Sequence, residues 1–170
     1  SWAMTTGGPD TSDVYEEELN PDGSKYLYDG KWIDLEREPI VIRVRTGEGM
    51  NQVERRIVRT HHGPVAMTSG AKAYAFKLSL LDQVHLLDQV RLMNTAKNLG
   101  EFLQALSMLQ LMPQNLMYAD IHGNMYYQRS GRVPIRPKGY DWKRPVPGNT
   151  SKTEWLGMHP MEDLVQILNP

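Results

Sequence analysis

Hydrophobic and polar residues alternate along much of the first third of the chain, which is the pattern of half-buried β-strands. The pair Asp29-Gly30 separates two short aromatic and apolar runs and accepts positive φ at both residues, so it predicts a two-residue hairpin turn. A second turn is expected at residues 46–49, between two longer runs. The strands predicted in this part of the chain cover residues 26–28, 31–33, 40–44, 53–60 and 71–78.

The middle of the chain is predicted to be helical. Residues 80–91 hold a six-residue near-duplication, and because six residues do not return to the same helical face, the apolar positions spread around the helix. We therefore expect a mostly buried helix there. A second helix is expected to begin at Asn98, whose spacing to Glu101 suits a capping box, and to end by Pro113.

The last third returns to strands and loops. Residues 117–120 and 125–128 flank a turn and predict a hairpin. Residues 131–148 are rich in proline and glycine, and so long an irregular segment usually lines or covers a site. The expected organisation of the whole chain is a β-rich part at 14–78, a helical pair at 79–112, and a β-hairpin with a Pro-rich loop segment at 113–170.

Composition excludes several classes of protein. The 170 residues carry 19 Lys and Arg against 20 Asp and Glu, so the net charge of -1 argues against a nucleic-acid binder or a membrane anchor with a general basic surface. No apolar run approaches the ~18 residues that span a bilayer. Cysteine is absent, which excludes disulfides and thiolate chemistry. The chain has no initiator Met and no signal peptide and stops in mid-pattern, so we interpret it as a piece of a longer polypeptide.

Three candidate sites each have a plainer alternative. Residues 10–13 could give two carboxylates and a backbone carbonyl to a hard cation such as calcium, or they could form a plain Asx-turn, which is the commoner case. His61 and His62 suggest a metal pair, but adjacent residues of a strand point to opposite faces, so we favour histidines in a loop or at a strand end. Ser1 could be a nucleophile activated by its own α-amine, or an accident of where the chain was cut.

Several blocks of residues lie along the chain in an order and spacing that are specific as a set. They are Trp2-Ala3-Met4-Thr5-Thr6-Gly7-Gly8-Pro9-Asp10, Asp13-Val14-Tyr15, Tyr26-Leu27-Tyr28-Asp29-Gly30-Lys31-Trp32, Arg59-Thr60-His61-His62-Gly63-Pro64, Tyr118-Ala119-Asp120-Ile121-His122-Gly123-Asn124, Gly131-Arg132-Val133-Pro134-Ile135-Arg136, Pro145-Val146-Pro147-Gly148 and Leu168-Asn169-Pro170. Together they resemble the penicillin acylase family of N-terminal nucleophile hydrolases over almost the whole chain.

The resemblance implies an α+β fold, namely a fragment of the αββα sandwich of these hydrolases with a β-rich insert. In that family a self-cleaving precursor frees the N-terminal serine of a large chain, which attacks an amide and forms an acyl-enzyme. Family members deacylate penicillins, cephalosporins or acyl-homoserine lactones, often in the periplasm or outside the cell. This segment is expected to start downstream of the serine and to be inactive alone. Its implied partners are the small chain, the rest of the large chain and an acyl amide substrate, without nucleic acid or membrane.

The resemblance also implies roles for individual residues. Thr6 aligns with the residue whose backbone N–H donates to the oxyanion. Met4, Gly8 and Gln114 align with positions near the acyl pocket, with Gly8 in place of a bulkier aromatic residue. A structural calcium ion is implied and no organic cofactor. The calcium ligands in this chain would be Asp10, the carbonyl of Ser12, Asp13 and the carbonyl of Trp142.

Two other functions stay open from the residues alone. The segment could belong to a non-enzymatic, β-rich binding module that shares only the scaffold, or Ser1 could be the nucleophile of a minimal hydrolase. A serine that follows a cleavable linker upstream of Trp2 in the parent gene would favour the acylase over both.

Overall fold

The computed structural model describes residues 1–47 and 49–169 as two compact units, each assembled from segments far apart in the sequence. Unit 1 consists of Ser1–Ser12, Leu78–Arg136 and Trp155–Pro170, and unit 2 consists of Asp13–Lys77 and Pro137–Glu154. Sheets dominate and two helices accompany them, so the fold is α+β, as the family resemblance predicts. No helix among the described residues is both long and apolar enough to cross a bilayer. Glu48 and Pro170 lie outside the described residues. Glu48 belongs to the predicted 46–49 turn, and Pro170 belongs to the last of the sequence blocks.

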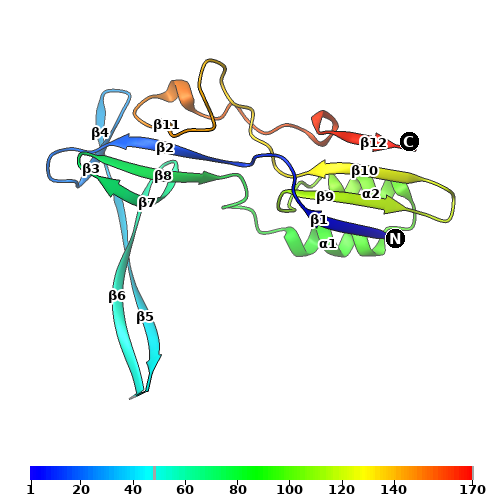
Figure 1. Ribbon diagram of the computed structural model, residues 1–170, viewed down its shortest axis with the longest axis horizontal. Helices are drawn as coiled ribbons and strands as arrows, with labels where there is room; N and C mark the ends of the chain where they lie inside the picture. The colour runs from blue at the N-terminus through cyan, green and yellow to red at the C-terminus, as the bar shows by residue number, and fades with distance from the viewer. Residues whose placement is uncertain (48, 170) are drawn as a thin grey trace. The chain divides into compact units, whose positions relative to one another are not determined.

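Unit 1 is built on a four-stranded antiparallel sheet with both helices on one face (Figure 1). In order across the sheet, the strands are β1 (Trp2–Thr6), β9 (Gln114–Ala119), β10 (Met125–Ser130) and β12 (Gln166–Leu168). The helices are α1 (Leu86–Thr95) and α2 (Leu99–Leu106), with a 3-10 turn η2 (Met161–Asp163) before β12. The β9–β10 hairpin confirms the prediction for the last third of the chain.

The core of unit 1 lies between the helices and the sheet. Phe102 and Leu106 of α2 are fully buried against Leu116 and Tyr118 of β9, with Met93 of α1 in the same cluster. The rings of Phe102 and Tyr118 lie 4.5 Å apart between centroids. Burying a side chain of this size contributes about 1.5–3 kcal/mol, so the buried cluster as a whole holds the helical layer on β9.

The start of α2 is as predicted, and its end is not. Asn98 Oδ1 accepts a hydrogen bond from Glu101 N at 2.9 Å, and the Glu101 carboxylate accepts one from Asn98 Nδ2 at 3.0 Å. The helix ends at Leu106 instead of continuing to Pro113. Leu109 adopts a positive φ of 51°, which turns the chain away from the helical path.

The first predicted helix is wrong in its extent and in its burial. Residues 80–85 lie in turns and irregular backbone, and α1 begins at Leu86. Within α1, Gln89 and Met93 are buried, whereas Leu87 is 81% exposed. The duplicated apolar residues lie on several sides of the helix, so they do not determine which side is buried. Gln110 N donates a hydrogen bond to Gln89 Oε1 at 2.6 Å, which keeps the Gln89 side of the helix buried.

Unit 2 is built on a six-stranded sheet and a separate two-stranded hairpin (Figure 1). Across the larger sheet the strands are β11 (Val146–Pro147), β2 (Ser12–Glu18), β8 (Lys72–Leu78), β7 (Gly63–Ser69), β6 (Gly49–Thr60) and β5 (Glu36–Thr46). The hairpin pairs β3 (Lys25–Tyr28) with β4 (Lys31–Asp34), and η1 (Ser151–Thr153) is a 3-10 turn. All the strands predicted for the first third are present. β11 pairs with β2 in parallel, so the Pro-rich segment contributes an edge strand.

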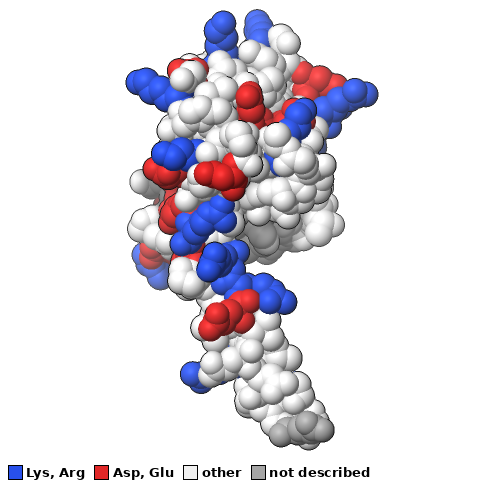
Figure 2. Space-filling model, turned by 90° about the vertical axis from the view of Figure 1, so that its left-hand side faces the viewer, with Lys and Arg blue, Asp and Glu red and all other residues white. Residues whose placement is uncertain are grey.

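A long hairpin of β5 and β6 extends beyond the rest of its sheet (Figure 1). The two strands pair from Glu36 opposite Arg59 to Thr46 opposite Gly49, and β6 pairs with β7 only near Arg59. Figure 2 shows charged side chains dense near the base of the hairpin and sparse towards its end. A two-stranded ribbon alone is marginally stable in water, so the hairpin depends on its base for stability.

The β3–β4 turn tests the role of one glycine. Asp29 and Gly30 have φ values of 45° and 76°, as a type I′ turn requires, and an added Cβ at Gly30 would meet nothing within 4 Å. Gly30→Val should lower the free energy of unfolding by about 1 kcal/mol or more, because β-branched residues tolerate this φ poorly. Gly30→Asn is the control, since Asn tolerates positive φ. Equal melting temperatures for all three proteins would contradict the turn assignment.

Candidate functional site

The open edge of β1 is the central feature of the candidate site in unit 1. β1 pairs with β9 on one side, and no described strand pairs with its other side. Ser1 and Ala119 exchange both backbone hydrogen bonds, since each N–H donates to the carbonyl of the other residue. Bonded pairs alternate along an antiparallel ladder. Counted from Ser1, every second residue hydrogen-bonds to β9, and Thr5 is one of them. Thr6 is not, so its N–H points to the open edge.

The residues that the family resemblance places near the oxyanion and the acyl group gather at this part of β1. Thr6 lies opposite Gln114 in the ladder, and Met4 lies opposite Leu116. Met4 is 40% exposed. Gly8 follows the strand with φ of 128°, and a Cβ there would meet Gln114 N at 2.7 Å. The backbone at this position therefore requires glycine, and the structure brings Met4, Thr6, Gly8 and Gln114 together.

Three side chains outside the predicted set of site residues hold the backbone that follows Thr6. Asn115 Nδ2 donates to the Thr6 carbonyl at 3.2 Å, and Asn115 Oδ1 accepts from Tyr127 OH at 3.0 Å. Arg129 donates to the Gly8 carbonyl at 2.5 Å. No local motif marks these residues, because only the register of three strands brings them beside the end of β1.

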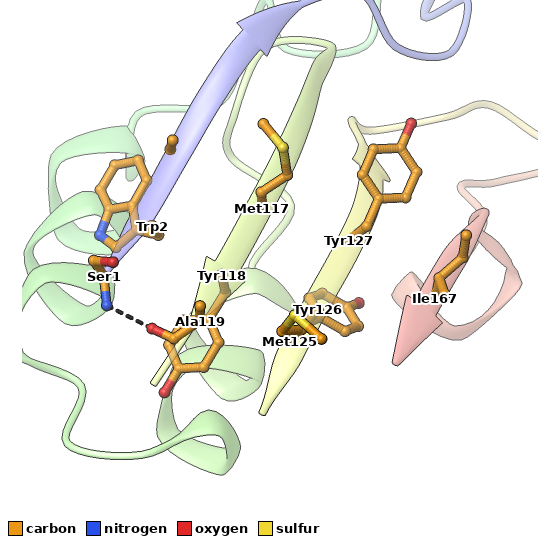
Figure 3. A pocket seen from close by; sticks show the side chains of 10 residues that line it. Ser1, Trp2, Met117, Tyr118, Ala119, Met125, Tyr126, Tyr127 and Ile167 are labelled. Carbon is orange, nitrogen blue, oxygen red and sulfur yellow. Dashed lines mark hydrogen bonds between the residues drawn. The ribbon is translucent and has the colours of Figure 1, made fainter. Parts of the chain in front are cut away.

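An apolar pocket of about 420 Å³ lies on the face of the sheet that the helices leave open (Figure 3). Met117, Tyr127 and Ile167 stand in one row across β9, β10 and β12. Beside them the Ser1 ammonium donates to the Ala119 carbonyl at 2.7 Å. Because the lining is mainly apolar and the Ser1 nitrogen is bonded within the sheet, the pocket offers a binding surface rather than an acid–base pair.

The residues assigned to calcium divide between the two units. In unit 1, Asp10 Oδ1 accepts from Ser12 N at 3.3 Å, so the plain Asx-turn is formed. The guanidinium of Arg136 lies 3.4 Å from Asp10 Oδ2 and donates to the Ser12 carbonyl at 3.4 Å. Carboxylate and carbonyl oxygens are the ligands that calcium prefers. The donor chemistry therefore fits calcium, with the Arg136 guanidinium as a competing cation.

The other two assigned calcium ligands lie in unit 2. Asp13 is 5% exposed near the start of β2. Trp142 is half-buried in the Pro-rich segment, where its indole N–H donates to the Pro137 carbonyl at 3.0 Å. The Trp142 ring meets the Tyr15 ring of β2 edge-on, with centroids 6.4 Å apart. The Pro-rich segment thus packs beside the strand that carries Asp13.

A buried polar cluster surrounds the turn between β6 and β7 in unit 2. His62 is 3% exposed; its Nδ1 lies 2.7 Å from Glu17 Oε1 and its Nε2 lies 2.8 Å from Glu154 Oε1. Thr60 Oγ1 donates to the same Glu17 oxygen at 2.8 Å. The Tyr15 ring stacks on the imidazole with centroids 3.7 Å apart. Both ring nitrogens of this buried histidine are therefore paired with carboxylates.

His61 faces the same carboxylate. Its Nε2 lies 2.9 Å from Glu154 Oε1, and its Nδ1 lies 3.0 Å from Tyr26 OH. Lys77 Nζ donates to the other Glu154 oxygen at 2.6 Å. The prediction that both histidines lie in a loop or at a strand end is confirmed. The expectation that their rings point to opposite faces is wrong, because a turn rather than a strand carries them.

Burial and hydrogen bonding act in opposite directions on the charges of this cluster. Burial lowers the pKa of His62, but the hydrogen bonds to Glu154 and Glu17 outweigh it and hold that pKa above its usual value. Burial raises the pKa of Glu154, but the hydrogen bonds from the two histidines and Lys77 outweigh it, so that pKa lies well below its usual range. The cluster therefore favours an imidazolium between two carboxylates.

Comparison with known proteins places this fold among the hydrolases. The solved structure of a thermostable penicillin G acylase from Alcaligenes faecalis matches it with a TM-score of 0.91 at 33% sequence identity, over 100% of this chain and 31% of that chain. A family model described as penicillin amidase matches residues 1–170. The chain belongs to the penicillin amidase family, as its sequence blocks predict.

Named relatives are similar over nearly the whole chain and are much longer. The penicillin G acylase of Escherichia coli is 32% identical, over 100% of this chain and 20% of that protein. The penicillin acylase 2 proenzyme of Pseudomonas sp. is 26% identical, over 100% of this chain and 22% of that protein. The acyl-homoserine lactone acylase QuiP of Pseudomonas aeruginosa is 25% identical, over 95% of this chain and 21% of that protein. The chain thus spans about a fifth of the length of these relatives.

Two neighbouring glutamates provide a matched test of the buried cluster. Glu17 is fully buried against His62, whereas Glu16 pairs with Lys72 near the surface. Glu17→Ala leaves a buried charge uncompensated and should lower the free energy of unfolding by about 3–5 kcal/mol. Glu16→Ala removes an exposed ion pair and should cost about 1 kcal/mol or less. Denaturant titration measures the free energy of unfolding of both variants. Equal losses would show that the buried pair stabilises the protein no more than the exposed pair does.

Proposed function

We propose that the protein containing this chain hydrolyses an amide bond to release its acyl group. The proposed substrates are penicillin-, cephalosporin- or acyl-homoserine-lactone-like amides. The observation that carries the proposal is the family match over the whole chain, which includes the residues around the open edge of β1. In this proposal the segment supplies the scaffold and one backbone donor, and the serine nucleophile lies on another part of the protein.

The proposed reaction passes through an acyl-enzyme. The α-amine of the N-terminal serine takes the proton of the serine hydroxyl, and the serine oxygen attacks the amide carbon. Negative charge then develops on the amide oxygen. The N–H of Thr6 points to the open edge of β1, which suits it to donate to that oxygen. The amine leaves with the transferred proton, and water cleaves the serine ester to release the acid.

Residues near the end of β1 are proposed to line the acyl side of the site. A side chain at Gly8 would meet the backbone of Gln114, so this position stays small. Asn115 and Arg129 are proposed as positioning residues, because they bond the carbonyls of Thr6 and Gly8 rather than a substrate. Acyl preference would follow from the space that these residues leave open.

A structural calcium ion is part of the proposal for the whole protein. Its ligands here would be the carboxylates of Asp10 and Asp13 and the carbonyls of Ser12 and Trp142. The ion would hold together residues that are distant in the sequence. Calcium takes about six to eight oxygens, so further ligands would come from other segments. The guanidinium of Arg136 contacts Asp10 and would have to give way.

The remaining segments of the same precursor are the proposed protein partners. The open face of the unit 1 sheet exposes Met117, Met125 and Ile167 to 41%, 50% and 47%. Contiguous apolar surface of this kind usually marks a place that another surface covers. The greater length of the relatives supports partners from within the same polypeptide. Neither nucleic acid nor a membrane is proposed as a partner.

A substitution that removes one backbone N–H tests the proposed oxyanion donor. Proline is tolerated on an edge strand where its nitrogen faces away from the ladder, so Thr6→Pro should leave the fold intact. In the full-length protein, Thr6→Pro should lower kcat for penicillin G or an acyl-homoserine lactone by about 10²–10³-fold. Thr6→Ala keeps the N–H and should keep most of the activity. Equal activity of the two variants would contradict the assignment of Thr6.

The isolated 170-residue chain serves as the inactive baseline of that experiment. It should hydrolyse neither substrate, because a covalent mechanism without its nucleophile loses the central step. Turnover by the chain that disappears in Ser1→Ala would assign the nucleophile to Ser1 instead. A full-length protein without turnover on either class of substrate would favour a non-enzymatic binding module.

Calorimetric titration with calcium tests the proposed ligands. The full-length protein should bind calcium tightly and the isolated chain weakly, because four ligands of the chain fall short of the about six to eight oxygens that the ion prefers. Asp10→Asn and Asp13→Asn should weaken binding in the full-length protein, and Asp22→Asn, in a turn of unit 2, is the control. Tight binding by the chain, or none by the full-length protein, would overturn the assignment.

A further inference from the structure

The histidine–glutamate cluster of unit 2 has a ligand geometry that the acylase reaction does not require. His61, His62 and Glu154 each place one possible ligand atom within 4.8 Å of those of the other two. His61 Nε2 and His62 Nε2 both approach the same oxygen, Glu154 Oε1, at 2.9 and 2.8 Å. We propose that these three atoms bind a divalent transition-metal ion, with Zn²⁺ as the best fit, and that water completes the coordination.

The outer atoms of both rings are already held in the orientation that metal binding needs. His62 Nδ1 faces Glu17 Oε1 at 2.7 Å, and His61 Nδ1 faces Tyr26 OH at 3.0 Å. Histidine ligands of metals usually give their second nitrogen to a carboxylate or another polar group, which fixes the ring. Because both Nδ1 atoms are occupied in this way, both Nε2 atoms converge on one point.

The carboxylate is held in a matching way. Lys77 Nζ bonds Glu154 Oε2 at 2.6 Å, which leaves Oε1 facing the rings. A tetrahedral ion with bonds of about 2.0–2.1 Å keeps its ligand atoms about 3.3–3.5 Å apart, so Oε1 must withdraw by about half an ångström. The Glu154 side chain is 26% exposed and the His61 side chain 33% exposed. The carboxylate thus has room to move, and an ion reaches the site from solvent.

The donor set selects the kind of metal. Two imidazoles and one carboxylate with an open fourth position are typical of Zn²⁺ sites that bind a water molecule. Imidazole suits Zn²⁺, Co²⁺ and Cu²⁺, whereas Ca²⁺ and Mg²⁺ prefer oxygen ligands. This site is therefore chemically distinct from the calcium ligands proposed above, and the two can be tested separately.

The charges that face the cluster can accommodate the ion. Two basic side chains, His62 and Lys77, face the carboxylates of Glu17 and Glu154. A nitrogen that binds a metal ion carries no proton. With the ion on both Nε2 atoms, each neutral ring therefore carries its proton on Nδ1, which faces Glu17 in His62 and the Tyr26 oxygen in His61.

Cobalt titration of the full-length protein tests this proposal, with calcium kept in excess so that the oxygen-ligand site stays filled. Co²⁺ bound by the cluster should produce visible d–d absorption bands that saturate at one ion and disappear when Zn²⁺ is added. His61→Gln changes a partly exposed ring and should abolish the bands without unfolding the protein. His85→Gln is the matched control, because His85 also pairs with one carboxylate but is exposed. Tyr26→Phe should weaken binding by about 10–100-fold.

The outcomes separate a metal site from a network of hydrogen bonds only. Bands in the wild type and in His85→Gln that are lost in His61→Gln support the site, as does a rise in melting temperature with Zn²⁺ that His61→Gln removes. Absence of bands in the wild type, or equal bands in His61→Gln, would overturn it. These results do not depend on acylase activity, so failure of the metal site and failure of the proposed function are distinguishable.

Discussion

The pairing register of β1 with β9 is the constraint on which the candidate site depends. A slip by one residue would exchange the two faces of β1 and would turn the Thr6 N–H from the open edge towards β9. The Ser1–Ala119 pair and the packing of Trp2 against Phe102, with centroids 6.4 Å apart, hold this register. The helical layer therefore determines, through the core, which backbone N–H groups of β1 point to the open edge of the sheet.

The stability of unit 2 depends on the buried polar cluster around His62. The apolar cluster within unit 2 is small, with Leu19, Tyr26 and Ala73 as its buried members. His62 provides a further connection within unit 2. It contacts both Glu17 of β2 and Glu154, which follows the Pro-rich segment. Buried charges stabilise a fold only when each one is paired, and here both carboxylates are paired. The same contacts make the cluster suitable for the proposed ion, because they hold both imidazoles and the Glu154 carboxylate in place.

Sequence patterns predict those parts of the fold whose signals are local. The β3–β4 turn and the Asn98 cap follow from two or four adjacent residues, and both are present. Local patterns do not predict the strand at Gly63–Ser69 or the true start of α1, because pairing with neighbouring strands and the buried Gln89 determine them. In the site, family blocks indicate Thr6 and its neighbours, whereas the positioning side chains and the convergent histidines depend on register and turn geometry that no spacing reveals.

The central claim is that the open edge of β1 presents the Thr6 N–H to the oxyanion of an acyl-transfer reaction. A crystal structure of the full-length protein with a phosphonate or boronate analogue of the tetrahedral intermediate tests it most directly. We expect an oxygen of the analogue to lie about 2.7–3.1 Å from Thr6 N, with the acyl group beside Met4 and Gly8. An analogue bound away from this edge, or a Thr6 N–H already bonded to another strand, would contradict it.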